Sequence, residues 1–161
     1  MTDRQGARAV LANGESAERE AALDIFYNRF ADNPLVLDKW FQTQALSARD
    51  DPPALVAELA QHPDFTLANP NRARALVGAF AVNQRAFHAA GGKGYRWLTD
   101  QLLALDRLNP QTSARLLPPL GRWRRFHATR SAAMRAELER IVTTPGISKD
   151  LFEQASKSIE G

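Results

Sequence analysis

Apolar residues recur every three or four positions along most of this chain, and the period-two alternation of half-buried strands is nearly absent. The stripe formed by Leu23, Phe26, Tyr27 and Phe30 shows the pattern, since these side chains fall on one face of a helix. Alanine and leucine dominate the apolar positions. The sequence therefore predicts an all-α protein.

Capping residues and prolines mark where the predicted helices begin and end. Asparagine or serine accepts hydrogen bonds from the first free amides of a helix, and proline fits its first turn. Pro118-Pro119 interrupts one predicted helix, because proline removes a backbone donor. The predicted helices are Thr2–Asn13, one capped by Ser16, Leu35–Ser47, one opened by Pro52-Pro53, Pro70–Val82, Tyr95–Leu108, Gln111–Arg125, one capped by Thr129 that runs to Val142, and one capped by Ser148.

These helices follow one another in pairs with short connections, and each pair occupies roughly the 35–45 residues of a helical repeat. An amphipathic pair cannot bury its apolar face alone, so stacked pairs would share one continuous core. The spacing predicts stacked antiparallel helix pairs that form a short curved α-solenoid, an ARM- or HEAT-like superhelix. A compact helical bundle is the competing arrangement.

The composition is typical of a soluble globular domain. Of 161 residues, 44% are hydrophobic and 24% are charged, and a domain of this length can bury a substantial core. No apolar run approaches the roughly 18 residues of a membrane span, and the N-terminus lacks the apolar segment of a signal peptide. The absence of cysteine fits a reducing compartment. We therefore expect a cytoplasmic protein with no membrane partner.

The sequence contains no recognisable catalytic or metal-binding motif. His62, His88 and His127 are never four residues apart, and no H-E-x-x-H, G-x-S-x-G or cysteine nucleophile occurs. We interpret His62 as a packed loop residue and His88 as a hydrogen-bonded loop anchor. The glycines of Gly91–Gly94 lack the spacing of a phosphate-binding loop. We predict no catalytic residue, no metal ligand and no cofactor in this chain.

One basic-aromatic segment, Arg122–Arg130, has two interpretations. Arginines interleaved with aromatic rings can bind nucleic acid. Alternatively, Trp123 and Phe126 face the core, while the arginines cap helix C-termini and pair with acids. The net charge is only +3, although arginine supplies 17 of the 21 basic residues. This small excess favours the structural interpretation, so we expect no nucleic-acid partner.

The stretch His62–Phe80, HPDFTLANPNRARALVGAF, places two arginines in the first turn of a predicted helix that Asn69 caps. The helix dipole opposes a cation there, so Arg72 and Arg74 each need an anionic partner or full hydration. In one interpretation they lie on the surface, paired with Asp64 or with solvent. In the other, one of them reaches a carboxylate of a substrate or of the domain.

This stretch resembles the C-terminal domain of bacterial aminopeptidase N, a family in the gluzincin class of zinc peptidases. Further stretches match in the same order, over nearly the whole chain: Met1–Arg4, Leu35–Phe41, Phe87-His88 with Gly94-Tyr95, Asn109–Gln111, Ala114–Leu116 and Ser148–Leu151. One departure is a loop where Gly91 and Lys93 replace the usual aspartate and serine. The resemblance favours the solenoid over the bundle, because the family's domain is an array of stacked helices.

The resemblance implies that residues 1–161 are a single C-terminal helical-repeat domain of a longer aminopeptidase, without the catalytic domain. It implies zinc in the full-length enzyme, the other domains of that polypeptide as partners, and peptides as substrates. The domain would close the active-site chamber and position peptides for removal of their N-terminal residue, but would be inactive alone. The alternative is a free-standing helical-repeat interaction module that begins at Met1.

The resemblance also implies a set of substrate-binding residues. In the family, polar residues of the NPNRxR and NPQxxxR motifs line the route to the active site, which assigns Arg74, Gln111 and Arg115 to that surface here. Gln111 and Arg115 are four residues apart and share a helix face. The planar fork of arginine matches a peptide carboxylate. In the structural alternative, both arginines bind acids or helix C-termini within the domain.

Overall fold

The computed structural model describes residues 17–47 and 51–161, and all regular structure in these ranges is helical. The longer helices are α2 (Ala17–Phe30), α3 (Pro34–Ala45), α4 (Pro52–Leu59), α8 (Lys93–Asp106), α11 (Ala128–Thr143) and α12 (Lys149–Glu160). The shorter helices and turns are α5 (Pro70–Ala73), η1 (Arg74–Gly78), α6 (Ala79–Val82), α7 (Gln84–Phe87), η2 (Ala90–Gly92), α9 (Pro110–Leu116), α10 (Pro118–Gly121) and η3 (Trp123–Arg125). The predicted all-α class is confirmed. The predicted helix Thr2–Asn13 and the cap Ser16 lie outside the described ranges.

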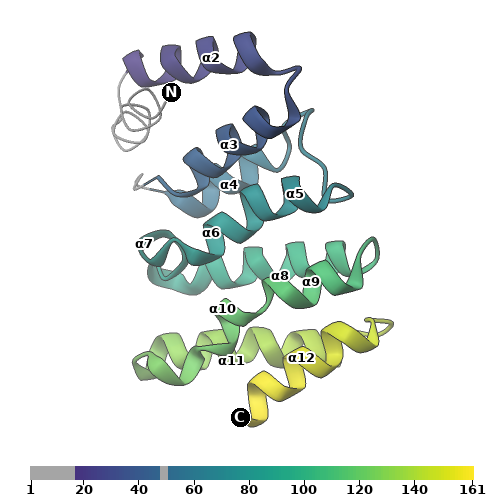
Figure 1. The fold of residues 1–161 in the computed structure, drawn as a ribbon. Coiled ribbons are helices and arrows are strands. Elements are labelled where there is room, and N and C mark those ends of the chain that lie inside the picture. The colour runs from purple at the N-terminus through teal and green to yellow at the C-terminus, as the bar shows by residue number, and fades with distance from the viewer. Residues whose placement is uncertain (1–16, 48–50) are drawn as a thin grey trace.

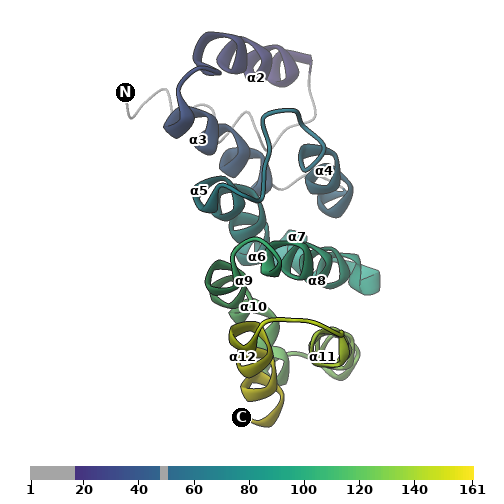
Figure 2. The same ribbon diagram turned by 90° about the vertical axis from the view of Figure 1, so that its right-hand side faces the viewer.

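The helices stack in two columns along one axis (Figure 1; Figure 2). In one column α3 packs against η1, η1 against α9, and α9 against α12. In the other column α4 packs against α8, and α8 against α11. The chain alternates between the columns, so that α8 packs against α9 and α11 packs against α12. This stacking of successive helix pairs confirms the α-solenoid and excludes the compact bundle.

Local capping signals set most helix starts where they were predicted. Prolines stand in the first turns of α3, α4, α5 and α9, and the preceding residues Asn33, Asp51, Asn69 and Asn109 accept hydrogen bonds from backbone amides. Ser148 caps α12 in the same way. One predicted cap is wrong, because α11 begins at Ala128 after His127 and Thr129 lies inside its first turn.

Two irregular segments interrupt the regular helices. The segment from Pro70 to Val82 has the predicted limits but contains a π-helical turn, η1, which the sequence analysis missed. The predicted break at Pro118-Pro119 is confirmed, because α9 ends at Leu116 and α10 and η3 follow as short separate turns.

One connected hydrophobic cluster runs through the stack, from Leu37 in α3 to Ala155 in α12. Its largest fully buried side chains include Phe41, Phe80 and Tyr95. Each repeat buries its apolar face against the next one, so the described residues from α3 onward share a single core.

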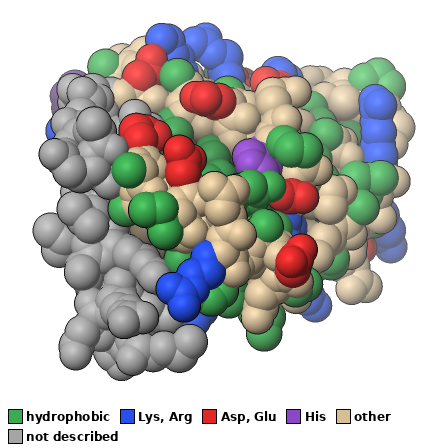
Figure 3. All heavy atoms as spheres, turned by 90° about the horizontal axis from the view of Figure 1, so that it is seen from above, with side chains coloured by type: hydrophobic (Ala, Val, Ile, Leu, Met, Phe, Trp, Pro, Cys, Tyr) green, Lys and Arg blue, Asp and Glu red, His purple; other side chains and the backbone are tan. Residues whose placement is uncertain are grey.

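The end of the stack at α2 has exposed hydrophobic and acidic side chains. Ile25 is 66% exposed and Leu35 is 71% exposed, and the acidic residues Asp24 and Asp32 are exposed near them in the sequence. Seen from this end, hydrophobic and acidic side chains are interspersed on the surface (Figure 3). None of the helices in the described ranges combines the length and apolarity that a membrane span requires.

Candidate functional site

The three predicted substrate-binding residues lie on adjacent elements of one column. Arg74 begins η1, whereas Gln111 and Arg115 lie one turn apart on α9. The contact between these elements is close, since a Cβ added to Gly78 would lie 3.2 Å from Leu116 Cδ2. All three side chains are exposed. The fold thus places residues from two distant motifs on neighbouring parts of the surface.

Few interactions within the described chain involve these three side chains. Arg74 Nη1 donates a hydrogen bond of 3.0 Å to Asn71 Oδ1, which is uncharged. The side chains of Gln111 and Arg115 have no hydrogen bond or ion pair with other described residues. The structural alternative, with Arg74 and Arg115 bound to acids or helix C-termini of the domain, is therefore not observed in this part of the chain.

Arg72, and not Arg74, forms an ion pair with a carboxylate of the domain. Its side chain is 7% exposed, and its Nε lies 2.5 Å from Asp38 Oδ1 on α3. Its Nη1 donates to the Asp64 carbonyl oxygen, and its guanidinium lies over the Phe41 ring, 5.2 Å from the centroid. Arg72 and Arg74 are two residues apart, so they leave opposite sides of the helix and only one can reach the interior.

Two histidines, His62 and His88, make structural contacts. The His62 ring packs against Tyr27, Trp40 and Phe41, with centroid distances of 5.1, 5.2 and 5.6 Å. His62 Nδ1 also accepts a hydrogen bond of 3.2 Å from the Asp64 amide. The prediction of a packed loop residue is confirmed.

His88 is the hydrogen-bonded loop anchor that was predicted. Its Nδ1 lies 2.9 Å from the Tyr95 hydroxyl, and its ring packs against the Phe126 ring, with centroids 4.1 Å apart and ring planes tilted by 32°. Burial, together with the charge of Arg130, lowers the pKa of His88 from its ordinary value. Both effects favour the neutral imidazole.

No group of three or more His, Cys, Asp or Glu side chains in the described ranges could hold a metal ion. The donor set therefore does not fit the zinc ion that the family resemblance implies for the full-length enzyme, because zinc needs at least three converging protein ligands.

In the basic-aromatic segment 122–130, Trp123 and Arg124 bind the end of helix α12. Trp123 Nε1 donates to the Ser158 carbonyl oxygen at 2.9 Å. Arg124 donates to the Ser158 and Ile159 carbonyl oxygens at the C-terminal end of α12, at 3.3 and 2.6 Å. These contacts confirm that an arginine of the segment caps a helix C-terminus.

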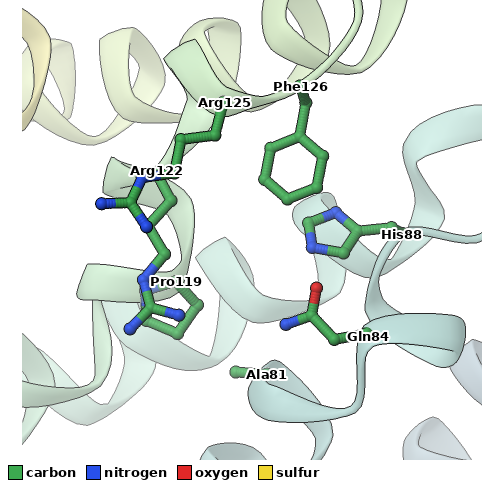
Figure 4. Close-up of a pocket in the computed structure, with 7 residues that line it drawn as sticks. All are labelled: Ala81, Gln84, His88, Pro119, Arg122, Arg125 and Phe126. Atoms are coloured by element: carbon green, nitrogen blue, oxygen red, sulfur yellow. The ribbon is translucent and has the colours of Figure 1, made fainter.

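Two arginines of the same segment line a pocket instead. Arg122 and Arg125 lie on one side of it, and His88, Phe126 and Gln84 lie on the other (Figure 4). The pocket volume is about 150 Å³. Sequence analysis singled out the arginines and His88 separately but missed their proximity, because α7 and η3 meet only when the repeats stack.

Stacked helix pairs in two columns, with a polar surface and no metal-binding cluster among the described residues, define an all-α repeat domain. The family model described as "Domain of unknown function (DUF3458_C) ARM repeats" matches residues 1–160. The chain therefore belongs to this family of ARM-repeat domains.

Relatives of the chain carry the name aminopeptidase N, which confirms the resemblance seen in the motifs. The chain is 46% identical over 160 residues to that of Caulobacter vibrioides, 42% over 161 residues to that of Haemophilus influenzae, and 40% over 160 residues to that of Escherichia coli. Each match covers 99% of this chain but only 18% of the relative.

A solved structure shows the same fold within a peptidase. The crystal structure of Legionella pneumophila aminopeptidase A in complex with aspartic acid superimposes with a TM-score of 0.94 at 32% identity. The match covers 99% of this chain and 19% of that chain. The chain thus spans about a fifth of the length of the proteins it resembles.

Proposed function

We propose that this chain is the C-terminal domain of a zinc-dependent aminopeptidase N, and that it closes the chamber in which peptides are cleaved. The observation that carries the proposal is the match of 99% of the chain to only 18% of each aminopeptidase N relative. On this proposal, residues 1–161 are one domain of a longer polypeptide, and the other domains are its partners. The domain limits access to short or unfolded peptides.

The proposal assigns peptide positioning to Arg74, Gln111 and Arg115. The exposure of these side chains on η1 and α9, and the lack of an acidic partner for either arginine in the described chain, support the assignment. An unpaired guanidinium can donate two parallel hydrogen bonds to a carboxylate, and the Gln111 amide can bind a peptide group. The three residues would contact the C-terminal side of a peptide.

The proposal assigns catalysis to the remainder of the polypeptide. A zinc ion held by residues outside this chain would supply the activation of water for peptide hydrolysis. This chain contributes walls and polar contacts, and alone it hydrolyses nothing. A cytoplasmic location is part of the proposal.

The test compares Arg115→Ala with Arg107→Ala in the full-length enzyme, since Arg107 is another exposed arginine without a partner among the described residues. Arg115→Ala should raise KM about five- to tenfold and change kcat less, because it removes ground-state binding. The effect should be larger for peptides with a free C-terminal carboxylate than for their amides. Equal KM values for both variants on both peptide types would refute the positioning role.

The genomic sequence upstream of the coding region separates this proposal from a free-standing interaction module. A continuous reading frame that encodes H-E-x-x-H followed by a glutamate ligand would support the aminopeptidase domain. A stop codon directly before Met1 would favour the interaction module instead.

A further inference from the structure

The pocket at the junction of α7, α10 and η3 has chemistry that the proposed function does not use. Arg122 and Arg125 form one wall, and the His88 and Phe126 rings form the opposite wall, with the Gln84 amide next to His88 (Figure 4). None of its lining residues is acidic. The pocket therefore concentrates positive charge without a counterion among its own lining residues.

The neighbouring arginines of the same segment have partners, which sets this pair apart. Arg124 binds carbonyl oxygens at the end of α12, and Arg130 Nε donates to the His88 carbonyl oxygen at 3.1 Å. The side chains of Arg122 and Arg125 make no hydrogen bond or ion pair with any described residue. Two like charges that line one cavity repel each other, so an anion between them would be stabilised.

The other walls favour a flat organic anion. The edge of an arginine fork donates two parallel hydrogen bonds that match the two oxygens of a carboxylate. Gln84 can add an amide donor, while the His88–Phe126 pair offers a flat, largely apolar surface to adjoining carbon atoms. The volume of about 150 Å³ equals that of an engineered cavity that admits benzene, so a carboxylate with a few carbon atoms fits.

We propose that the Arg122–Arg125 pocket is a carboxylate-binding site. Its ligand is a carboxylate group carried on a short carbon chain, from either an acidic side chain or a peptide C-terminus. Arg122 and Arg125 bind the carboxylate oxygens, Gln84 donates to them, and the His88–Phe126 wall contacts the carbon chain. The inference involves none of Arg74, Gln111 and Arg115, and it holds whether or not the proposed function is correct.

The test titrates the 161-residue chain with small probes at constant ionic strength and pH 7.5, followed by ¹⁵N-NMR of the Gln84 side-chain amide and the arginine Nε–H groups. N-acetylglutamate α-amide presents only a side-chain carboxylate, and N-acetylglutamine presents only a terminal carboxylate. N-acetylglutamine amide is the neutral control, and inorganic phosphate is the competing anion.

Saturable shifts at Gln84, Arg122 and Arg125 with either carboxylate probe are the expected result, and the better probe identifies the source of the carboxylate. The double variant R122Q/R125Q should weaken that binding at least tenfold. The matched control R85Q/R107Q removes two exposed charges from outside the lining and should change the affinity less than twofold.

Three results would overturn the assignment. The first is the absence of saturable shifts with both carboxylate probes. The second is a double variant, R122Q/R125Q, that binds as tightly as the parent while its amide spectrum shows an intact fold. The third is phosphate or the neutral amide binding as tightly as the better carboxylate, since the pocket would then not recognise a carboxylate.

Discussion

Replacement of Arg72 tests whether the N-terminal repeats depend on one buried ion pair. The Arg72 side chain is 7% exposed and that of Asp38 is 16% exposed, and the pair joins the helix beginning at Pro70 to α3. Arg72→Met retains much of the apolar stem but leaves Asp38 without its cation. Breaking a buried pair from one side costs about 3–5 kcal/mol. Because Asp38 keeps some contact with water, we expect the lower limit, about 3 kcal/mol.

Urea denaturation of the 161-residue chain, followed by circular dichroism, measures this loss. A cost of about 3 kcal/mol in a chain of this size corresponds to a fall in Tm of about 6–12 °C. Arg74→Met is the matched control, because Arg74 is exposed and bonds only to Asn71; its cost should be within about 0.5 kcal/mol.

A double-mutant cycle separates the ion pair from the loss of packing. Asp38→Leu alone should also destabilise, because it leaves Arg72 buried without an anion. The double variant with Arg72→Met and Asp38→Leu should be more stable than either single variant, since apolar residues can replace a buried pair at little cost. Additive losses, or a loss below about 1 kcal/mol for Arg72→Met, would refute the reasoning.

Two further predictions concern the junction between α7 and α8. An alanine Cβ at Gly94 would lie 2.6 Å from the Phe87 carbonyl oxygen, so Gly94→Ala should destabilise by about 1–3 kcal/mol in urea denaturation, and an unchanged midpoint would contradict this contact. Burial and Arg130 lower the pKa of His88, so the unfolded chain binds its proton more readily than the folded one. The stability that His88 contributes is therefore complete above its unfolded pKa of about 6.5 and is lost as pH falls through the lower folded value. The His88→Gln variant should lose less free energy of unfolding than the parent chain between pH 7.5 and 5. An identical pH dependence for both chains would exclude this role of His88.

The helix starts were predictable because their signals are local. Asn69 followed by Pro70, and Asn109 followed by Pro110, cap and open helices with atoms two or three residues away, so no tertiary contact is needed. The family motifs also occur in the expected order along the chain, and the resemblance to the aminopeptidase N C-terminal domain rests on them. The π turn at Arg74–Gly78 was missed because its residues include no proline and no side-chain cap.

The candidate site was only partly readable from the sequence. Helical geometry alone separates Arg72 from Arg74, yet which of the two turns inward depends on where α3 places Asp38. The substrate-binding role of Arg74, Gln111 and Arg115 stays a prediction. The pocket of Arg122 and Arg125 was not foreseen, since its other wall comes from α7.

The order of residues by itself determined the helical class and most helix limits, because capping and amphipathic spacing act within one or two turns. Spacing alone left the solenoid and the compact bundle open, and the family resemblance favoured the solenoid. The tertiary structure alone decided which arginines are buried, which bind helix ends and which remain available to an anion. That choice depends on the register in which one repeat packs on the next, and register arises from the shapes of side chains that meet only in the folded chain.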